Sequence, residues 1–163
     1  MIVRREIPSD HEAVRAQVAS VYSAELIDGL RASDTWLPAL SFVALGGDGE
    51  VVGHIAGTRG RIGSAPALVL VPPSIEPDQR GRGVGQALMH SILGAAEALD
   101  EPLVGIVAFP PEYYARFGFR PAADYALAAP VEEWQPSFMV RPLIAYDDSV
   151  RGTFIFPDPF LGS

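Results

Sequence analysis

Short apolar runs and alternating patterns along this chain predict several β-strands. Ile2–Ile7 is the first, and Pro8 ends it. Ser41–Leu45 and Glu50–Thr58 predict two strands, and Gly46-Gly47-Asp48-Gly49 between them is typical of a hairpin turn. Further apolar runs predict four more strands: Leu68–Val71, Leu103–Phe109, Phe119–Ala122 and Phe138–Ala145. Because the first two of these runs are almost unbroken, we expect them to be buried on both faces of a sheet.

Apolar residues at helical spacing predict helices between the strands. A first helix is expected over about residues 10–29, with Ser9 and Glu12 at the spacing of a capping box. Its apolar face is made of valine and leucine: Val14, Val18, Val21 and Leu26. A second apolar face predicts a helix that ends near Leu99: Val84, Leu88, Ile92 and Ala95. Pro111–Arg116 can form a short helix with proline at its start.

These elements, in their order, predict one α/β domain. The chain has 163 residues, of which 48% are apolar and 20% charged, as in an ordinary globular protein. Neither a linker nor an internal repeat divides it. We therefore expect a single domain over residues 1–163, in which the segment 146–163 is a tail that packs back on the body through its aromatic residues.

Composition excludes several kinds of chemistry. Cysteine is absent, which excludes disulfides, thiolate metal sites and a cysteine nucleophile. All 12 basic residues are arginine, so a Walker-type lysine and a Schiff-base lysine are excluded as well. The 3 histidines are scattered without ligand spacing, and we expect no metal. A serine-hydrolase elbow of the Gly-x-Ser-x-Gly type is also missing.

The formal net charge of −8 argues against nucleic acid as a partner, since phosphate binding needs a surplus of positive charge. The longest apolar stretch, Ala65–Pro73, is too short and too rich in proline to span a membrane. Met1–Glu6 turns polar before the apolar core of a signal peptide could form. A cytoplasmic location without membrane contact is the expectation.

A glycine-rich loop, Gln79–Gly85, lies between a buried strand and an amphipathic helix. Glycines allow positive φ angles, and a helix start presents unpaired N–H groups to an anion. Arg80 and Arg82 could add charge-assisted contacts to phosphate. A dinucleotide fingerprint fails, because Gln86 stands where its third glycine belongs. The loop therefore predicts a pyrophosphate site of another kind, with a turn that binds no ligand as the alternative.

Two motifs resemble those of the GNAT superfamily of acyltransferases. Arg80-x-x-Gly83-x-Gly85 is similar to its (Gln/Arg)-x-x-Gly-x-(Gly/Ala) signature, and Tyr113–Phe119 to its tyrosine-rich segment after the next strand. Further matches favour the branch described as predicted N-acetyltransferases: Pro72, Pro77, Pro111, Phe138-Met139-Val140, Gly152, Phe156-Pro157 and Phe160. The resemblance implies a mixed, mostly antiparallel central sheet flanked by helices on both faces.

The resemblance also implies a reaction and its residues. An acetyl group would pass from acetyl-CoA to a primary amine, of a small molecule or a protein, by direct attack in a ternary complex. Tyr114 would be the general acid for the departing thiolate, with Tyr113 as the alternative. Since Pro73 has no N–H, the backbone of Ile75 would contact the acyl oxygen. Coenzyme A would contact residues of the strand end and the loop: Ile75, Arg80, Gly81, Arg82, Gly83, Val84, Gly85 and Gln86.

Several points stay open at this stage. His54 is a possible general base, beside Glu76, Glu25 and a chain of waters. Trp36 and Trp134 are candidates for the acceptor cleft. The amine acceptor is undetermined, and a homodimer is possible. The adjacent prolines Pro72-Pro73 motivate an alternative function, a non-catalytic acyl-CoA-binding or sensor module of the same fold. An ordinary nucleotide-binding domain is a weaker third reading.

Overall fold

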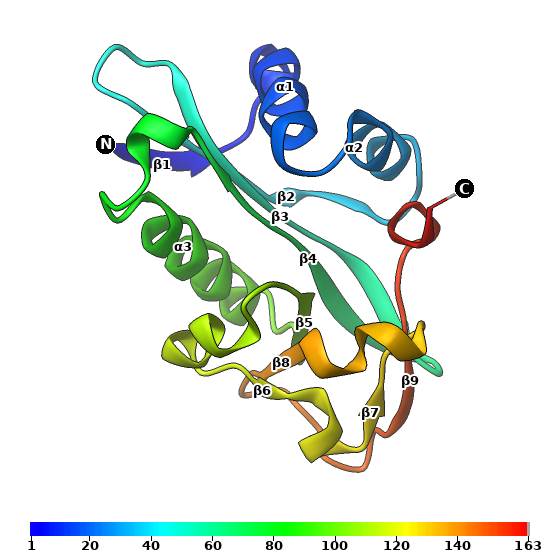
Figure 1. Ribbon diagram of the computed structural model, residues 1–163. Helices are drawn as coiled ribbons and strands as arrows, with labels where there is room; N and C mark the ends of the chain where they lie inside the picture. The colour runs from blue at the N-terminus through cyan, green and yellow to red at the C-terminus, as the bar shows by residue number, and fades with distance from the viewer. Residues whose placement is uncertain (163) are drawn as a thin grey trace.

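The computed structural model describes residues 1–162, which form a mixed sheet with helices on both faces (Figure 1). Its strands are β1 (Ile2–Arg5), β2 (Trp36–Leu45), β3 (Val51–Ile62), β4 (Ala65–Ile75), β5 (Leu103–Val107), β6 (Arg120–Pro121), β7 (Leu127–Ala128), β8 (Phe138–Pro142) and β9 (Gly152–Ile155). The order is β1-β2-β3-β4-β5-β8-β6, and the neighbours along it are antiparallel except for the parallel pair β4–β5. The predicted mixed, mostly antiparallel α/β sheet is confirmed.

Three α-helices cover the sheet: α1 (His11–Val21), α2 (Ala24–Arg31) and α3 (Val84–Ala98). Figure 1 shows α1 and α2 on one face and α3 on the other. The described part of the chain also has six short 3₁₀-helices: η1 (Pro8–Asp10), η2 (Pro77–Gln79), η3 (Pro111–Phe117), η4 (Ala122–Tyr125), η5 (Glu132–Ser137) and η6 (Asp158–Leu161). The short helix expected after Pro110 is therefore confirmed as η3.

The prediction of one helix over residues 10–29 is wrong, because the helix is interrupted between the end of α1 at Val21 and the start of α2 at Ala24. Ser23 is extended (φ −154°, ψ 151°), and its hydroxyl accepts a hydrogen bond from the Leu26 N–H, which caps α2. The five-residue step from Val21 to Leu26 is also longer than a helical turn.

The capping box predicted for Ser9 and Glu12 is also wrong. The side chain of Asp10 fills this role instead, since it accepts a hydrogen bond from the Ile7 N–H (2.9 Å) and pairs with Arg4 (2.7 Å).

The strand predictions hold in position but not in length. β2, β3 and β4 extend well beyond the expected segments, whereas β5, β6 and β8 end earlier. β4 continues through Pro72 and Pro73 because the two prolines lie at a β-bulge. Ala56 pairs with Val71 and His54 with Ser74, so two steps along β3 match three along β4. Proline is tolerated at a bulge, where the ladder is already interrupted.

A gap opens between β4 and β5 beyond this point. The two strands pair only at Leu68–Val104 and Val69–Gly105, although β4 continues to Ile75. Their parallel direction places both carboxyl ends at the same edge of the sheet. Because ligands of open α/β sheets bind at such strand ends, the gap is a candidate ligand site.

The last segment of the described chain packs against the body. β9 pairs with β3 at Arg61–Ile155 and Ile62–Phe154, and it pairs in parallel with β7. Phe154 is fully buried, and its ring meets those of Phe138 and Phe156 edge to face. Within residues 1–162, no helix has the length and apolar character needed to cross a membrane.

Candidate active site

The glycine-rich loop carries two backbone conformations that favour glycine. Gly81 has φ +78° and Gly83 has φ +82°, and Gly83 is the N-cap of α3. The first hydrogen bond of α3 runs from the Ala87 N–H to the Gly83 carbonyl. The N–H groups of the preceding helical residues therefore have no partner inside the helix, and the positive end of the helix dipole lies beside them.

Other predicted loop residues support this arrangement or surround it. A Cβ on Gly85 would come within 3.0 Å of the Ile75 side chain, so glycine lets the helix start approach the end of β4. Val84 is buried in the core, whereas Arg80, Arg82 and Gln86 are exposed. Neither arginine forms an ion pair with the described residues, so both guanidinium groups remain free to meet an anion.

A hollow of about 360 Å³ lies between this loop, the end of β4 and η3, and we call it the loop hollow. It brings together residues that are far apart in the sequence: Pro73, Ile75, Arg80, Gly85, Tyr113 and Tyr114. Met89, Phe109 and Phe117 also line it. Sequence reasoning missed these three. Phe109 was assigned to the strand Leu103–Phe109, but β5 ends at Val107 and the Phe109 side chain is 78% exposed.

Tyr114 faces the loop hollow from η3. The residue is 8% exposed, and its ring contacts Tyr113 and Phe119 edge to face. Burial, with a smaller contribution from Tyr113, raises the pKa of Tyr114 to about 12. Its hydroxyl makes no hydrogen bond to residues 1–162 and stays protonated at neutral pH. Tyr113 is less buried, and its ring lies 4.0 Å from the Arg116 guanidinium.

The backbone of Ile75 faces the gap rather than β3. The Glu76 N–H donates to the Val52 carbonyl of β3, and N–H groups of successive strand residues point to opposite sides. The Ile75 N–H therefore points toward the side where β5 has separated. The nitrogen of Pro73, two residues earlier, points to the same side but carries no hydrogen. Ile75 is therefore the backbone donor at this strand end.

His54 lies outside the loop hollow, on the face of the sheet covered by α1 and α2. It is fully buried, and its Nε2 lies 2.9 Å from the Ser41 hydroxyl, which donates to Glu6 (2.7 Å). Because a hydroxyl has one proton to give, the His54 Nε2–H donates to Ser41 and Nδ1 is unprotonated. Glu6 in turn pairs with Arg31. Nδ1 is buried without a hydrogen-bond partner among the described residues, and the network through Nε2 holds the imidazole away from the residues around Tyr114.

Burial lowers the pKa of His54 to about 4, with Glu6 raising it and Arg31 lowering it by smaller amounts. The imidazole is thus neutral at pH 7 but enclosed. The suggestion that His54 is the general base stays a prediction, without a contact to the hollow in its support. Glu76 and Glu25 are exposed, and they line neither the loop hollow nor the hollow on the other side of the gap.

A second hollow, of about 300 Å³, lies on the other side of the gap, and we call it the apolar hollow. α2, the strand ends and the C-terminal third of the chain contribute its walls: Leu26, Leu70, Pro72, Val107, Trp134 and Phe160. Tyr22 and Ser23, from the break between α1 and α2, also line it. In Figure 1, α2, η5 and η6 lie to the right of the end of β5, and η3 and α3 to its left.

Of the two tryptophans considered for an acceptor cleft, Trp134 lines the apolar hollow and Trp36 does not. The Trp36 ring instead lies 4.7 Å from the Arg31 guanidinium. The remaining walls were not predicted as site residues, because they come from four separate segments of the chain, around residues 22–26, 70–72, 107 and 156–162. Tyr22 carried one usable signal, an aromatic residue directly before the helix-capping Ser23.

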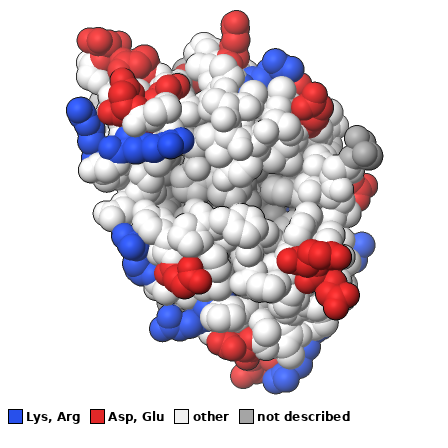
Figure 2. Space-filling view, viewed as in Figure 1, with Lys and Arg blue, Asp and Glu red and all other residues white. Residues whose placement is uncertain are grey.

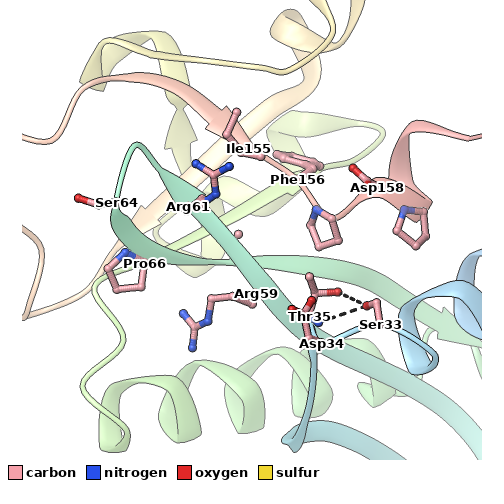
Figure 3. A pocket seen from close by; sticks show the side chains of 13 residues that line it. Ser33, Asp34, Thr35, Arg59, Arg61, Ser64, Pro66, Ile155, Phe156 and Asp158 are labelled. Carbon is pink, nitrogen blue, oxygen red and sulfur yellow. Dashed lines mark hydrogen bonds between the residues drawn. The ribbon is translucent and has the colours of Figure 1, made fainter.

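A third hollow, of about 460 Å³, lies beside β9 and the far part of β3 (Figure 3). Its arginines are already engaged: Arg59 makes two hydrogen bonds to Glu101, and Arg61 donates to the Gly63 carbonyl. Figure 3 shows Arg61 next to Ile155 and a hydrogen-bonded pair, Ser33 and Thr35. None of the predicted site residues lines this hollow. Within residues 1–162, no group of three or more His, Cys, Asp or Glu could hold a metal ion.

Several known proteins similar to this chain are described as acetyltransferases. Residues 8–122 match the family model described as an acetyltransferase (GNAT) domain. The Escherichia coli (strain K12) protein described as uncharacterized N-acetyltransferase YjhQ is 31% identical over 144 residues, which are 83% of this chain and 78% of that protein.

Solved structures agree. The GNAT family N-acetyltransferase YhbS from Escherichia coli, in complex with CoA, has a TM-score of 0.88 at 24% identity and covers 98% of this chain and 91% of its own. A GNAT family acetyltransferase from Brucella melitensis, in complex with acetyl-CoA, has a TM-score of 0.76 at 27% identity and covers 98% and 97%.

Proposed function

This chain belongs to the GNAT family of acetyltransferases, and we propose that it moves an acetyl group from acetyl-CoA to a primary amine in a ternary complex. The loop hollow carries this proposal, because one cavity joins an anion-binding loop, an inward backbone donor and an unpartnered tyrosine hydroxyl. Acetyl-CoA supplies a thioester, which is an acyl group already activated toward an amine.

The pyrophosphate of coenzyme A fits the loop. The N–H groups at the start of α3 and the side chains of Arg80 and Arg82 would hold its oxygens, and Gly81 and Gly83 shape the backbone around them. Binding of CoA by YhbS from Escherichia coli and of acetyl-CoA by the Brucella melitensis protein supports this assignment.

The residues around the gap would perform the transfer. A free amine attacks the thioester carbonyl carbon, and the Ile75 N–H donates a hydrogen bond to the oxygen on which negative charge develops. The carbon–sulfur bond breaks, and Tyr114 supplies a proton to the departing sulfur. Its raised pKa keeps the Tyr114 hydroxyl protonated as a donor over the physiological range. The attacking nitrogen loses a proton to solvent and becomes the amide nitrogen, and Tyr114 takes up a proton from solvent, which restores its hydroxyl.

The prolines that motivated a non-catalytic module have a structural role. Pro72 and Pro73 form the β4 side of the bulge against β3, and they lie beyond Val69, the last residue of β4 that pairs with β5. Because proline has no N–H, Pro73 cannot donate to a neighbouring strand on that side. The pair therefore helps to open the gap, and the Ile75 N–H still faces it. For these reasons we favour the enzyme over the binding module.

Tyr114→Phe tests the proposal. With a competent amine in hand, kcat should fall by roughly 10²-fold or more, while the Kd for acetyl-CoA from a binding titration stays within about twofold. Thiol release and amide formation, followed together, give the rate.

Two further tyrosines make the test specific. Tyr125→Phe is the matched control, since Tyr125 lines neither the loop hollow nor the apolar hollow and packs on Tyr146. Tyr113→Phe tests the alternative donor. Full activity of Tyr114→Phe with loss in Tyr113→Phe would move the role to Tyr113. Tight acetyl-CoA binding without acetylation of any amine by the wild type would leave the non-catalytic module as the function.

A further inference from the structure

The apolar hollow has a wall chemistry that differs from the rest of the surrounding surface. None of its described lining residues is Asp, Glu, Arg or His, and its side-chain polar groups are the hydroxyls of Tyr22 and Ser23 and the indole of Trp134. Charged side chains instead gather around the margin of this face, and its hollowed centre is formed by uncharged residues (Figure 2). This contrast is unexpected in a chain with a net charge of −8.

The position of the apolar hollow points to the acceptor. Pro72 lines the apolar hollow and the adjacent Pro73 lines the loop hollow, so the two cavities flank the same bulge of β4. Val107, the last residue of β5, lines the apolar hollow, and Phe109, two residues later, lines the loop hollow. Tyr114 also lies near enough to Tyr22 to add to the effect of burial, which raises the Tyr22 pKa. An amine held in the apolar hollow would therefore meet the reaction centre through the gap.

Resting on the proposed function, we infer that the acceptor is a small apolar primary amine, with an aryl or alkyl body and without a carboxylate, a phosphate or a second ammonium group. The aliphatic and aromatic walls, Leu26, Leu70, Val107 and Trp134 among them, would bury the body. About 300 Å³ is at the small end of ligand cavities, which suits a body of one or two rings.

The free-energy cost of burying a charge enforces this selection. A carboxylate or a second ammonium would be buried against apolar side chains without a counter-charge, which is strongly unfavourable. The reacting ammonium, by contrast, can lose its proton. Because an apolar environment disfavours the charged form, it lowers the pKa of a bound amine and increases the fraction that can attack. The pocket would thus assist deprotonation without a dedicated basic side chain.

Matched amine pairs test the inference. We expect 2-phenylethylamine to exceed L-phenylalanine, which adds only a carboxylate, by roughly 100-fold or more in kcat/KM. Hexylamine should exceed 1,6-diaminohexane in the same direction. Equal or better use of L-phenylalanine, spermidine or a lysine peptide would overturn the acceptor class while leaving the acetyltransferase proposal intact.

A charge introduced into the wall should reverse the preference in part. Leu26→Arg places a guanidinium at the apolar hollow, and the ratio of kcat/KM for 2-phenylethylamine over L-phenylalanine should fall by about tenfold or more. Leu99→Arg adds the same charge at an exposed position at the end of α3 and should leave the ratio unchanged. Thermal melting and acetyl-CoA titration check that both variants are folded. An unchanged ratio in a folded Leu26→Arg would contradict the placement.

A binding measurement separates this inference from the proposed function. The chain has 2 tryptophans, so Trp36→Phe leaves Trp134 as the one fluorophore of its kind. Saturating 2-phenylethylamine should shift the Trp134 emission without acetyl-CoA present, and L-phenylalanine should not. If the shift occurs but no amine is acetylated, the proposed function fails and the apolar site stands. If acetylation occurs without a shift at Trp134, the apolar hollow is not the acceptor site.

Discussion

Tyr114 and His54 are both buried and titratable, yet their surroundings differ. Tyr114 packs in the core cluster that includes α3, and its hydroxyl faces the loop hollow without a partner among the described residues. His54 lies beneath α1 and α2, and its Nε2–H is bound into the chain that runs through Ser41 to Glu6 and Arg31. Burial raises the pKa of Tyr114 and lowers that of His54, and in both cases it favours the neutral form of the side chain. A displaced pKa alone therefore does not identify a catalytic group; an open neighbouring cavity is also needed.

The largest expected effect that distinguishes the roles of Tyr114 and His54 is on the pH dependence of kcat/KM. With pKa values of about 12 for Tyr114 and about 4 for His54, neither side chain changes protonation between pH 6 and pH 9. The acceptor ammonium does, and kcat/KM should rise by about tenfold per pH unit below its pKa, or roughly 10³-fold over this range. Initial rates of thiol release in a constant ionic-strength buffer measure it. A break near pH 6.5 that disappears in His54→Gln would instead restore His54 as the base.

The second effect concerns stability in acid. The folded pKa of His54 is about 4 and its ordinary value is 6.5, so the unfolded chain binds the proton first as the pH falls. The stabilisation is fully present above pH 6.5 and is lost progressively toward pH 4, by about 2 kcal/mol at pH 5. His54→Gln should lack this loss in urea unfolding at pH 7.5 and pH 5.

An exposed histidine gives the control for that experiment. His90→Gln, on the outer surface of α3, should keep the wild-type acid sensitivity. Since His54→Gln removes a buried hydrogen bond, its stability at pH 7.5 will be lower, and the argument depends on the difference between the two pH values. Equal acid sensitivity of His54→Gln and wild type would show that folding does not lower the pKa of His54.

The sequence predicts residues of the loop hollow better than residues of the apolar hollow. The loop and Tyr114 lie in short contiguous motifs, each next to a strongly patterned element, and so the strand–loop–helix unit and η3 were found. The apolar hollow is assembled from segments far apart in the sequence, and Trp134 is its only described lining residue that was predicted for an acceptor cleft. Pro72 and Pro73 suggested a defect, because a bulge is visible only once the register of β3 against β4 is known.

The third effect tests whether the loop end of the site carries an anion. Arg80→Ala should weaken acetyl-CoA binding by about tenfold, as expected for a charge-assisted contact at an exposed position. It should also reduce the salt dependence of the Kd, because one ionic contact is removed. Arg61→Ala, which removes an exposed arginine beside the third hollow, is the matched control and should bind as wild type. Loss of affinity in both variants would indicate a general charge effect rather than a site.

The smallest effect distinguishes the two serines beside His54. The Ser41 hydroxyl donates a hydrogen bond to Glu6 and accepts one from His54. The buried Ser74 hydroxyl, opposite His54 on β4, has no partner among the described residues. Ser74→Ala removes an unsatisfied buried group, so it should be neutral or stabilising by up to about 1 kcal/mol in urea unfolding. Ser41→Ala should destabilise, because it leaves His54 Nε2–H without an acceptor. A clear destabilisation by Ser74→Ala would show that its hydroxyl is hydrogen bonded in the folded protein.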